Sequence, residues 1–211
     1  MTAIIKICGI TNEIDAHLAL RYGADWLGFN FYKPSPRYIE PTAARKIIDT
    51  LPPEAGTVGL FVNADLPVIQ AVLERCPVRM IQLHGDESGE QCRAVAKFGV
   101  PVMKALRIRR PEDIDQIREY PVDTILLDAF RQEVYGGTGQ TFDWSWIRAT
   151  GGKKIFLAGG IRSDNIEEAL RVGTYGIDLC SGVEKEPGIK DTGKMKDLFQ
   201  KIRNYYEKES E

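Results

Sequence analysis

The sequence predicts a single (β/α)8 TIM barrel, formed by one domain over residues 1–211, and three observations favour this fold. Eight short apolar runs alternate with eight helical patterns. The runs recur at spacings of about 22 or about 31 residues, the length of one strand-and-helix unit. No linker composition divides the chain, and its length is sufficient for one well-buried core.

A doubly wound open sheet is the competing fold. That fold usually carries a G-x-G-x-x-G turn after its first strand. In this chain the same turn reads Cys8-Gly9-Ile10-Thr11. The number of units in a compact length therefore favours the barrel.

The first strand is predicted over residues 4–7, where β-branched residues dominate, and it ends at Cys8 and Gly9. Thr11 or Asn12 can cap a helix over residues 13–22. Cys8 therefore lies at the carboxyl end of a strand, which is the end that carries the chemistry in parallel α/β folds. A small buried hydrophobic residue is the alternative role for such a thiol.

The second unit places an arginine beside the next strand end. A strand is predicted over residues 26–31, followed by a loop that Pro34 and Pro36 make stiff. This loop presents Arg37, which could otherwise be an ordinary surface charge. A helix over residues 41–51 follows, with proline in its first turn.

The middle units end two strands in residues capable of chemistry. Strands are predicted over residues 57–62, 80–83, 101–106 and 124–127, and helices over 64–75, 90–98 and 111–119. His84 ends the fourth strand and could either order a loop or act chemically. Asp128 ends the sixth, wholly apolar strand, so it should be partly exposed, paired or functional rather than simply buried.

The last units contain most of the glycine-rich turns. The segment 135–140 holds three glycines in four positions, a weak signal for a ligand-binding loop. A strand over residues 155–158 is closed by Gly159 and Gly160, and a strand over 177–180 by Ser181 and Gly182. Helices are expected after each, the first capped within residues 163–165 and the second over 192–206, with a frayed acidic tail.

Composition restricts the classes of partner. The formal net charge of -2 provides no basic field for nucleic acid or anionic lipid. No basic-then-apolar leader and no apolar run of ~20 residues is present, so we expect a soluble, cytoplasmic protein. The sequence leaves open whether it is a monomer or a homodimer. The four cysteines are far apart and only two histidines accompany them, so neither a zinc site nor disulfides are expected.

In a barrel, the residues that end the strands meet on one rim. Glycine-rich turns after the seventh and eighth strands commonly bind phosphate, because free amides and the helix dipole favour a dianion. A thiol and a carboxylate across that rim suit proton transfer at two positions of one substrate, if the pKa of Cys8 is lowered and that of Asp128 raised. A phosphorylated small molecule is the expected ligand, and no metal or nucleotide is required.

Several segments, in order along nearly the whole chain, resemble the phosphoribosylanthranilate isomerase family. They are Lys6-Ile7-Cys8-Gly9-Ile10-Thr11, Gly28-Phe29-Asn30-Phe31 with Ser35-Pro36-Arg37-Tyr38, Val58-Gly59-Leu60-Phe61-Val62-Asn63, Gln82-Leu83-His84-Gly85, Leu127-Asp128, Gly136-Gly137-Thr138-Gly139 with Phe142-Asp143-Trp144, Leu157-Ala158-Gly159-Gly160, and Asp178 with Ser181-Gly182-Val183-Glu184. One departure is Cys180, where the family often has a small or polar residue; we expect a buried filler there.

The resemblance implies an Amadori rearrangement in tryptophan biosynthesis, without a cofactor. It implies that Asp128 is the general acid, Cys8 the general base and Arg37 the partner of the anthranilate carboxylate. The remaining residues expected to bind substrate, mainly at its phosphate, are His84, Gly137, Thr138, Gly139, Gly159, Gly160, Ser181 and Gly182. Asp178 matches the family pattern but is not assigned to the catalytic set.

Three alternatives are weighed against this assignment. A histidine-pathway Amadori isomerase resembles a twofold-repeated barrel with two catalytic carboxylates, whereas here one partner is Cys8. A ribulose-phosphate epimerase would need metal ligands that two histidines poorly supply. A catalytically silent phosphate-binding module would keep the glycines but would have no need for both Cys8 and Asp128.

Overall fold

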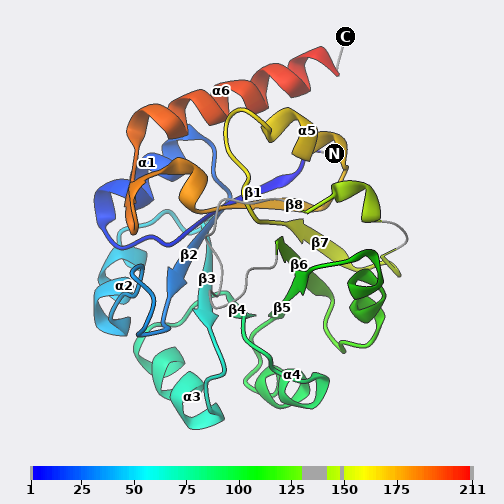
Figure 1. Ribbon diagram of the computed structural model, residues 1–211. Helices are drawn as coiled ribbons and strands as arrows, with labels where there is room; N and C mark the ends of the chain where they lie inside the picture. Colours follow the sequence, from blue (N-terminus) through cyan, green and yellow to red (C-terminus); the bar gives the residue numbers. More distant parts are fainter. Residues whose placement is uncertain (1, 130–141, 148–149, 210–211) are drawn as a thin grey trace.

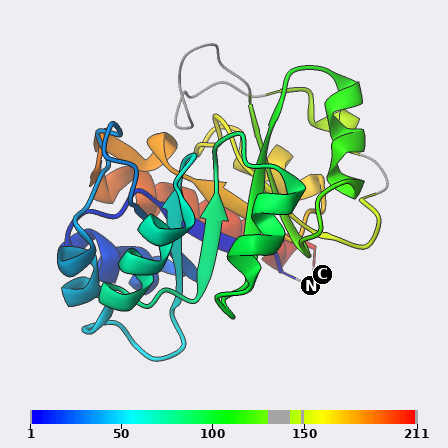
Figure 2. The ribbon, with the colours of Figure 1, turned by 90° about the horizontal axis from the view of Figure 1, so that it is seen from below.

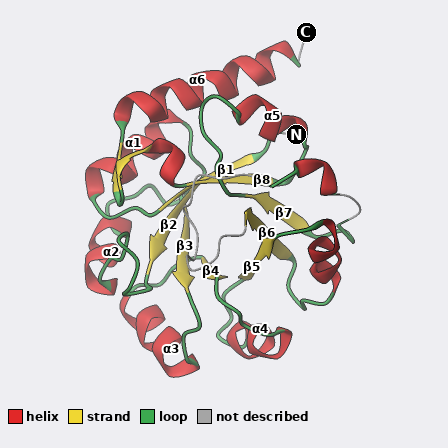
Figure 3. Cartoon of the chain, in the orientation of Figure 1, coloured by secondary structure: helices red, strands yellow, loops and turns green. Residues whose placement is uncertain are grey.

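Eight parallel strands close into a barrel in the computed structural model, which describes residues 2–129, 142–147 and 150–209. Seen along the barrel axis, the strands form a central ring and the helices lie outside it (Figures 1 and 3). Each strand pairs with its sequence neighbour, and β8 pairs with β1 to close the ring. The predicted barrel is confirmed, and the open sheet is excluded.

The strands occupy the predicted apolar runs with small shifts at their ends. They are β1 (Ile4–Cys8), β2 (Trp26–Asn30), β3 (Gly56–Phe61), β4 (Met80–Leu83), β5 (Val102–Ile108), β6 (Thr124–Ala129), β7 (Lys154–Leu157) and β8 (Gly176–Leu179). Successive side chains of a strand point to opposite faces of the sheet. Ile5 and Ile7 of β1 pack outward against the helices, and Lys6 and Cys8 therefore face the barrel interior.

Six α-helices cover the barrel within the described residues. They are α1 (Glu13–Tyr22), α2 (Pro41–Ile48), α3 (Leu66–Arg75), α4 (Gly89–Ala96), α5 (Ile166–Arg171) and α6 (Thr192–Lys208). Asn12 caps α1, accepting a hydrogen bond from the Asp15 amide at 2.8 Å. The long helix α6 contacts both α1 and α5 and reaches two residues beyond the predicted end (Figure 1).

Two of the predicted helical units differ from α-helices. The helix predicted over 111–119 is the 3-10 helix η1 (Pro111–Arg118), in which Ile114 and Ile117 are buried. Side chains three residues apart share one face of a 3-10 helix, so this geometry turns both isoleucines toward the core. Between β6 and β7 the described helix is only η2 (Trp144–Trp146).

A further unpredicted feature follows β8. The 3-10 helix η3 (Ser181–Val183) leads into an antiparallel pair of short strands, β9 (Glu184–Glu186) and β10 (Ile189–Lys190). Lys190 returns to β1, where its ammonium contacts the Cys8 carbonyl oxygen at 2.5 Å. The segment before β1 also lies beside α6 (Figure 2), where the Ala3 amide donates to the Tyr206 hydroxyl at 2.7 Å.

Candidate active site

A cavity opens among the residues that end the strands. Seven residues singled out in the sequence line it: Cys8, Arg37, His84, Asp128, Gly159, Gly160 and Ser181. Asn30, Ser35, Leu60, Ala158, Ile161, Asp178 and Cys180 complete the lining. Gly137, Thr138 and Gly139 lie outside the described residues.

The Cys8 thiol lies at the end of β1 and is only 6% exposed. A hydrogen bond from the Cys180 thiol is the main cause that holds the pKa of Cys8 well below its usual range. Burial opposes this shift, whereas the Lys6 and Lys190 ammonium groups favour it. The lowered pKa agrees with what the sequence required of a cysteine base.

Cys180 is not the buried filler that the sequence suggested. It is half-buried, lines the cavity and packs against the small cluster of Cys8, Leu60 and Val62. Its thiol lies 3.8 Å from the Glu184 carboxylate. The pKa of Cys180 is raised well above its ordinary value, chiefly by the hydrogen bond to Cys8 and further by burial. Cys180 therefore stays a thiol when Cys8 ionises.

Asp128, near the end of β6, is held by a chain of polar side chains. Its Oδ2 atom is 3.1 Å from Nε2 of His84, and Nδ1 of His84 is 2.7 Å from Nε2 of Gln82. If the Gln82 amide donates to Nδ1, the neutral imidazole carries its proton on Nε2 and donates it to Asp128. His84 therefore orients the carboxylate, and both residues are buried.

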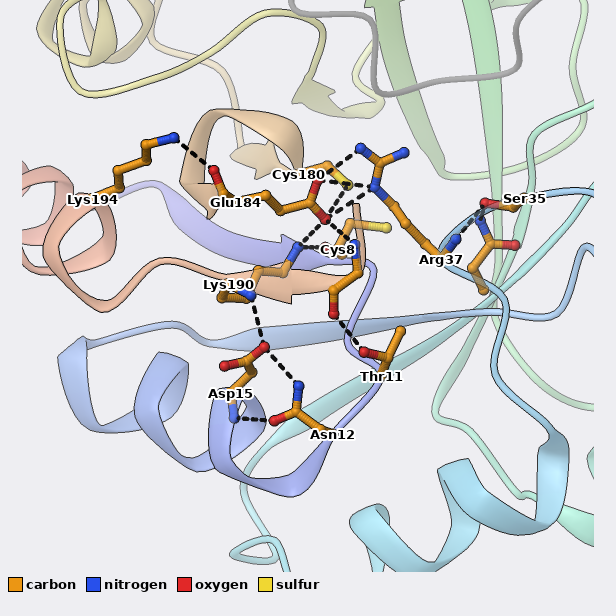
Figure 4. Close-up of polar contacts among 12 residues, drawn as sticks. Cys8, Thr11, Asn12, Asp15, Ser35, Arg37, Cys180, Glu184, Lys190 and Lys194 are labelled. Carbon is orange, nitrogen blue, oxygen red and sulfur yellow. Dashed lines mark hydrogen bonds and ion pairs between the residues drawn. The ribbon is translucent and has the colours of Figure 1, made fainter. Parts of the chain in front are cut away.

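Arg37 contacts Glu184, which follows η3, rather than open solvent (Figure 4). Its Nη2 atom donates to Glu184 at 2.7 Å and its Nε atom at 3.0 and 3.1 Å. The same carboxylate accepts from Lys190 at 2.9 Å and from the Gly188 amide at 3.2 Å. Burial acts to raise the pKa of Glu184, but the bonds from Arg37 and Lys190 outweigh it and lower that pKa.

The turns after β7 and β8 pack directly on each other. Gly159 and Gly160 both have positive φ, at 85° and 66°. An ideal Cβ atom on Gly182 would lie 2.0 Å from the Ile161 carbonyl oxygen, so the turn carrying Ser181 rests on the turn after β7. The Asn165 side chain stabilises the turn after β7: it donates to the Gly160 carbonyl at 3.0 Å and accepts from the Arg162 amide at 2.8 Å.

Asp178, which lines the cavity, forms a buried ion pair with Lys6 that the sequence did not predict. Lys6 is 0% exposed, and its ammonium is 2.8 Å from the Asp178 carboxylate. Lys6 precedes Cys8 by two residues, and side chains two residues apart on a strand point to the same face. This spacing was the signal in the sequence that Lys6 lies near Cys8. Glu184 and Lys190 were also missed, because their partners lie far away in the sequence.

Neither a metal site nor a membrane-spanning helix is found among the described residues. No group of three or more histidine, cysteine or acidic side chains there could hold a metal ion. No helix of the same residues is long and apolar enough to cross a membrane.

Sequence comparisons with known proteins all point to one family. A sequence model of the family described as N-(5'phosphoribosyl)anthranilate (PRA) isomerase matches residues 5–201. An N-(5'-phosphoribosyl)anthranilate isomerase of Trichlorobacter lovleyi is 45% identical over 202 residues, which cover 94% of this chain and 97% of that protein.

Solved structures give the same result. The phosphoribosyl anthranilate isomerase of Thermus thermophilus superposes with a TM-score of 0.86 at 39% identity, covering 95% of this chain and 98% of that one. A second phosphoribosyl anthranilate isomerase structure is 34% identical and superposes with a TM-score of 0.81, and the match covers 96% of this chain and 100% of that one. It was solved in complex with reduced 1-(o-carboxyphenylamino)-1-deoxyribulose 5-phosphate.

Proposed function

This chain belongs to the N-(5'-phosphoribosyl)anthranilate isomerase family, and on that premise we propose that Asp128 and Cys8 are its general acid and general base. The chain is an isomerase of the intramolecular oxidoreductase class and acts in tryptophan biosynthesis. Its reaction is the Amadori rearrangement of N-(5'-phosphoribosyl)anthranilate to 1-(2-carboxyphenylamino)-1-deoxyribulose 5-phosphate. The observation that carries the proposal is the presence of both groups in the lining of one cavity.

Asp128 performs the first step in this proposal. Its carboxyl group protonates the ribose ring oxygen, and the C–O bond opens to give a Schiff base between the sugar and the anthranilate nitrogen. His84 positions the carboxyl through the contact at 3.1 Å. Burial keeps bulk water from competing for the proton.

Cys8 performs the second step. Its thiolate removes the proton from C2 of the Schiff base, which gives an enolamine that tautomerises to the ketone. The lowered pKa of Cys8 supports this role, because a base works best when its pKa lies near the working pH. The reaction moves protons and rearranges bonds within one molecule, so it consumes no oxidant or reductant.

Arg37 is proposed to bind the anthranilate carboxylate. Nε and Nη2 of Arg37 bond Glu184, so the fork is held in one orientation with its Nη1 edge available to the ligand. The opposite end of the substrate, its phosphate, is assigned to Gly160 and to the turn of Ser181 and Gly182. Backbone amides at such turns favour a dianion.

We propose that residues 1–211 form one catalytic domain that acts on a phosphosugar. The closed barrel and the family match over residues 5–201 support the single unit. The related structure that holds a reduced phosphosugar product supports the substrate class. We assign Gly159 a positional role between Asp128 and the phosphate turn, because it adjoins both.

Steady-state turnover tests the proposal. Freshly generated phosphoribosylanthranilate is supplied to wild type, Cys8→Ala and Asp128→Asn, and the loss of anthranilate fluorescence is followed. Each variant should lose roughly 10²- to 10⁴-fold in rate, the typical contribution of one acid or base. Product binding, measured by calorimetry, should persist in both. Near wild-type turnover in either variant would remove that residue from its assigned role.

A further inference from the structure

We propose that Lys6 is a positioning residue that stabilises the thiolate of Cys8, and that Asp178 competes with this thiolate for the same buried ammonium group. The inference rests on the proposed role of Cys8 as the base and deepens it. It concerns two buried charges to which the steps above give no role.

Geometry brings the three groups together. Lys6 and Asp178 are register partners on the paired strands β1 and β8, and their side chains meet at 2.8 Å. Lys6 and Cys8 are two residues apart on β1 and point to the same face. Gly28 on β2 confirms this: an ideal Cβ atom there would lie 2.8 Å from the Cys8 sulfur and 3.2 Å from Cε of Lys6.

Burial strengthens the electrostatic interactions among these three groups. Lys6 is fully buried and Asp178 is 8% exposed, so neither charge is well screened by water. An ammonium group has three donors. The Asp178 carboxylate accepts one of them at 2.8 Å, and the Cys8 sulfur, which lies on the same side of the strand, accepts another. One cation therefore faces two groups that can each become an anion.

The pKa directions agree with a shared cation. Burial acts to lower the pKa of Lys6, but the charges of Asp178 and Cys8 outweigh it and raise that pKa. Burial raises the pKa of Asp178 to about 7, although the charge of Lys6 opposes the rise. The charge of Cys8 also acts to raise the pKa of Asp178, so the two groups titrate as a coupled pair, in which ionisation of one disfavours ionisation of the other.

Other charged groups also face these residues and set the background. Cys8 is affected by Cys180 after β8 and by Lys190 of β10, and Asp178 by His84 after β4. Arg37, which pairs with Glu184, also interacts electrostatically with Cys8, and Asp128 lines the same cavity. Because these groups stay unchanged in variants of Lys6 or Asp178, they shift the absolute midpoint but not the direction of each change.

The competition predicts opposite effects for the two variants. Lys6→Met removes the cation and should raise the ionisation midpoint of Cys8 by roughly one to three pH units, a tenfold or greater loss of thiolate at a fixed pH below it. Asp178→Asn removes the competing anion and should lower the midpoint. Thiolate absorbance in the far ultraviolet, taken as the difference from Cys8→Ser, gives each midpoint without any need for turnover.

Lys104→Met is the matched control. Lys104 is also almost fully buried and pairs with one buried carboxylate, that of Glu87, at 2.8 Å. Its ammonium also donates to the carbonyl oxygens of Leu83 and Gly85 and lies 5.9 Å from the centre of the Tyr120 ring. This variant should lose stability, as any broken buried pair does, yet leave the Cys8 midpoint at its wild-type position.

Two outcomes would overturn the proposal: equal midpoints in Lys6→Met and Lys104→Met, or a shift of the same sign in Lys6→Met and Asp178→Asn. If Lys6→Met does not fold, the sign of the Asp178→Asn shift decides alone. The acid limb of the kcat/KM profile should move with each midpoint. If Cys8→Ser keeps full turnover, the proposed base is wrong, whereas the absorbance result still decides the role of Lys6.

Discussion

Gly159→Ala should damage catalysis through Asp128 rather than through stability alone. Gly159 has a φ of 85°, which disfavours a side chain. An ideal Cβ atom there would also lie 2.6 Å from the Ala129 amide nitrogen and 2.8 Å from Oδ1 of Asp128. These distances are too short for real contacts, so β6 or the turn after β7 must move.

Gly159→Ala should lower both the free energy of unfolding and kcat. The positive φ costs roughly 1–2 kcal/mol for alanine, and crowding of a packed site adds about 1–3 kcal/mol. Unfolding in urea should therefore show a loss of about 2–5 kcal/mol in total. Misplacement of a reacting group by ~1 Å costs about 10²-fold in rate, so kcat should fall by up to that factor.

Gly173→Ala separates strain from crowding. Gly173 has a φ of 71° and is exposed, and nothing lies within 4 Å of an ideal Cβ atom there. This variant should therefore lose only about 1–2 kcal/mol and keep its kcat. If both variants lost the same stability and both kept kcat, the argument that Gly159 makes room for Asp128 would be wrong.

Three further predictions concern Glu184, Cys180 and Asp178. Glu184→Gln should raise KM roughly tenfold more than it lowers kcat, because one lost charge-assisted bond of about 1.5–3 kcal/mol frees Arg37 to turn; a larger loss in kcat than in KM would contradict this. Cys180→Ala should move the acid limb of the kcat/KM profile to higher pH, since it removes the main hydrogen bond that lowers the pKa of Cys8; an unmoved limb would exclude that bond. The pKa of Asp178 is raised to about 7, above its unfolded value, so its contribution to stability is present in acid and is lost as pH rises toward 7. Asp178→Asn should remove a slope of at most about 1.4 kcal/mol per pH unit from urea unfolding between the two pKa values, and an unchanged slope would refute the assignment.

The elements were predictable where one local pattern decides them. The strand beginning at Ile4 and the capping of α1 by Asn12 each depend on a few adjacent residues. The 3-10 geometry of η1 was not predictable, because it depends on how Ile114 and Ile117 reach the core at the same time. The pair β9 and β10 was missed because its strands span only three and two residues.

In the site, too, features set by adjacent residues were predictable, and contacts between residues far apart in the sequence were not. Cys8 and Asp128 could be singled out because a reactive residue ending an apolar strand is visible in the sequence. Their surroundings could not, because Arg37 meets Glu184 across 147 residues and Lys6 meets Asp178 across 172. Only closure of the barrel, with β8 beside β1, creates these contacts. The role of Cys180 was misjudged for the same reason.

The electrostatics of β1 also explain why a thiol suits this position. Lys6 and Lys190 both favour an anion at residue 8. A carboxylate starts from a pKa of about 3.9, and these cations act to lower it, whereas burial, which raises the pKa of Asp178 to about 7, acts in the opposite direction. A thiol starts from about 8.5, above neutral pH, so the hydrogen bond from Cys180 and the same cations act to bring its pKa toward the working pH. The buried charges therefore match a cysteine base.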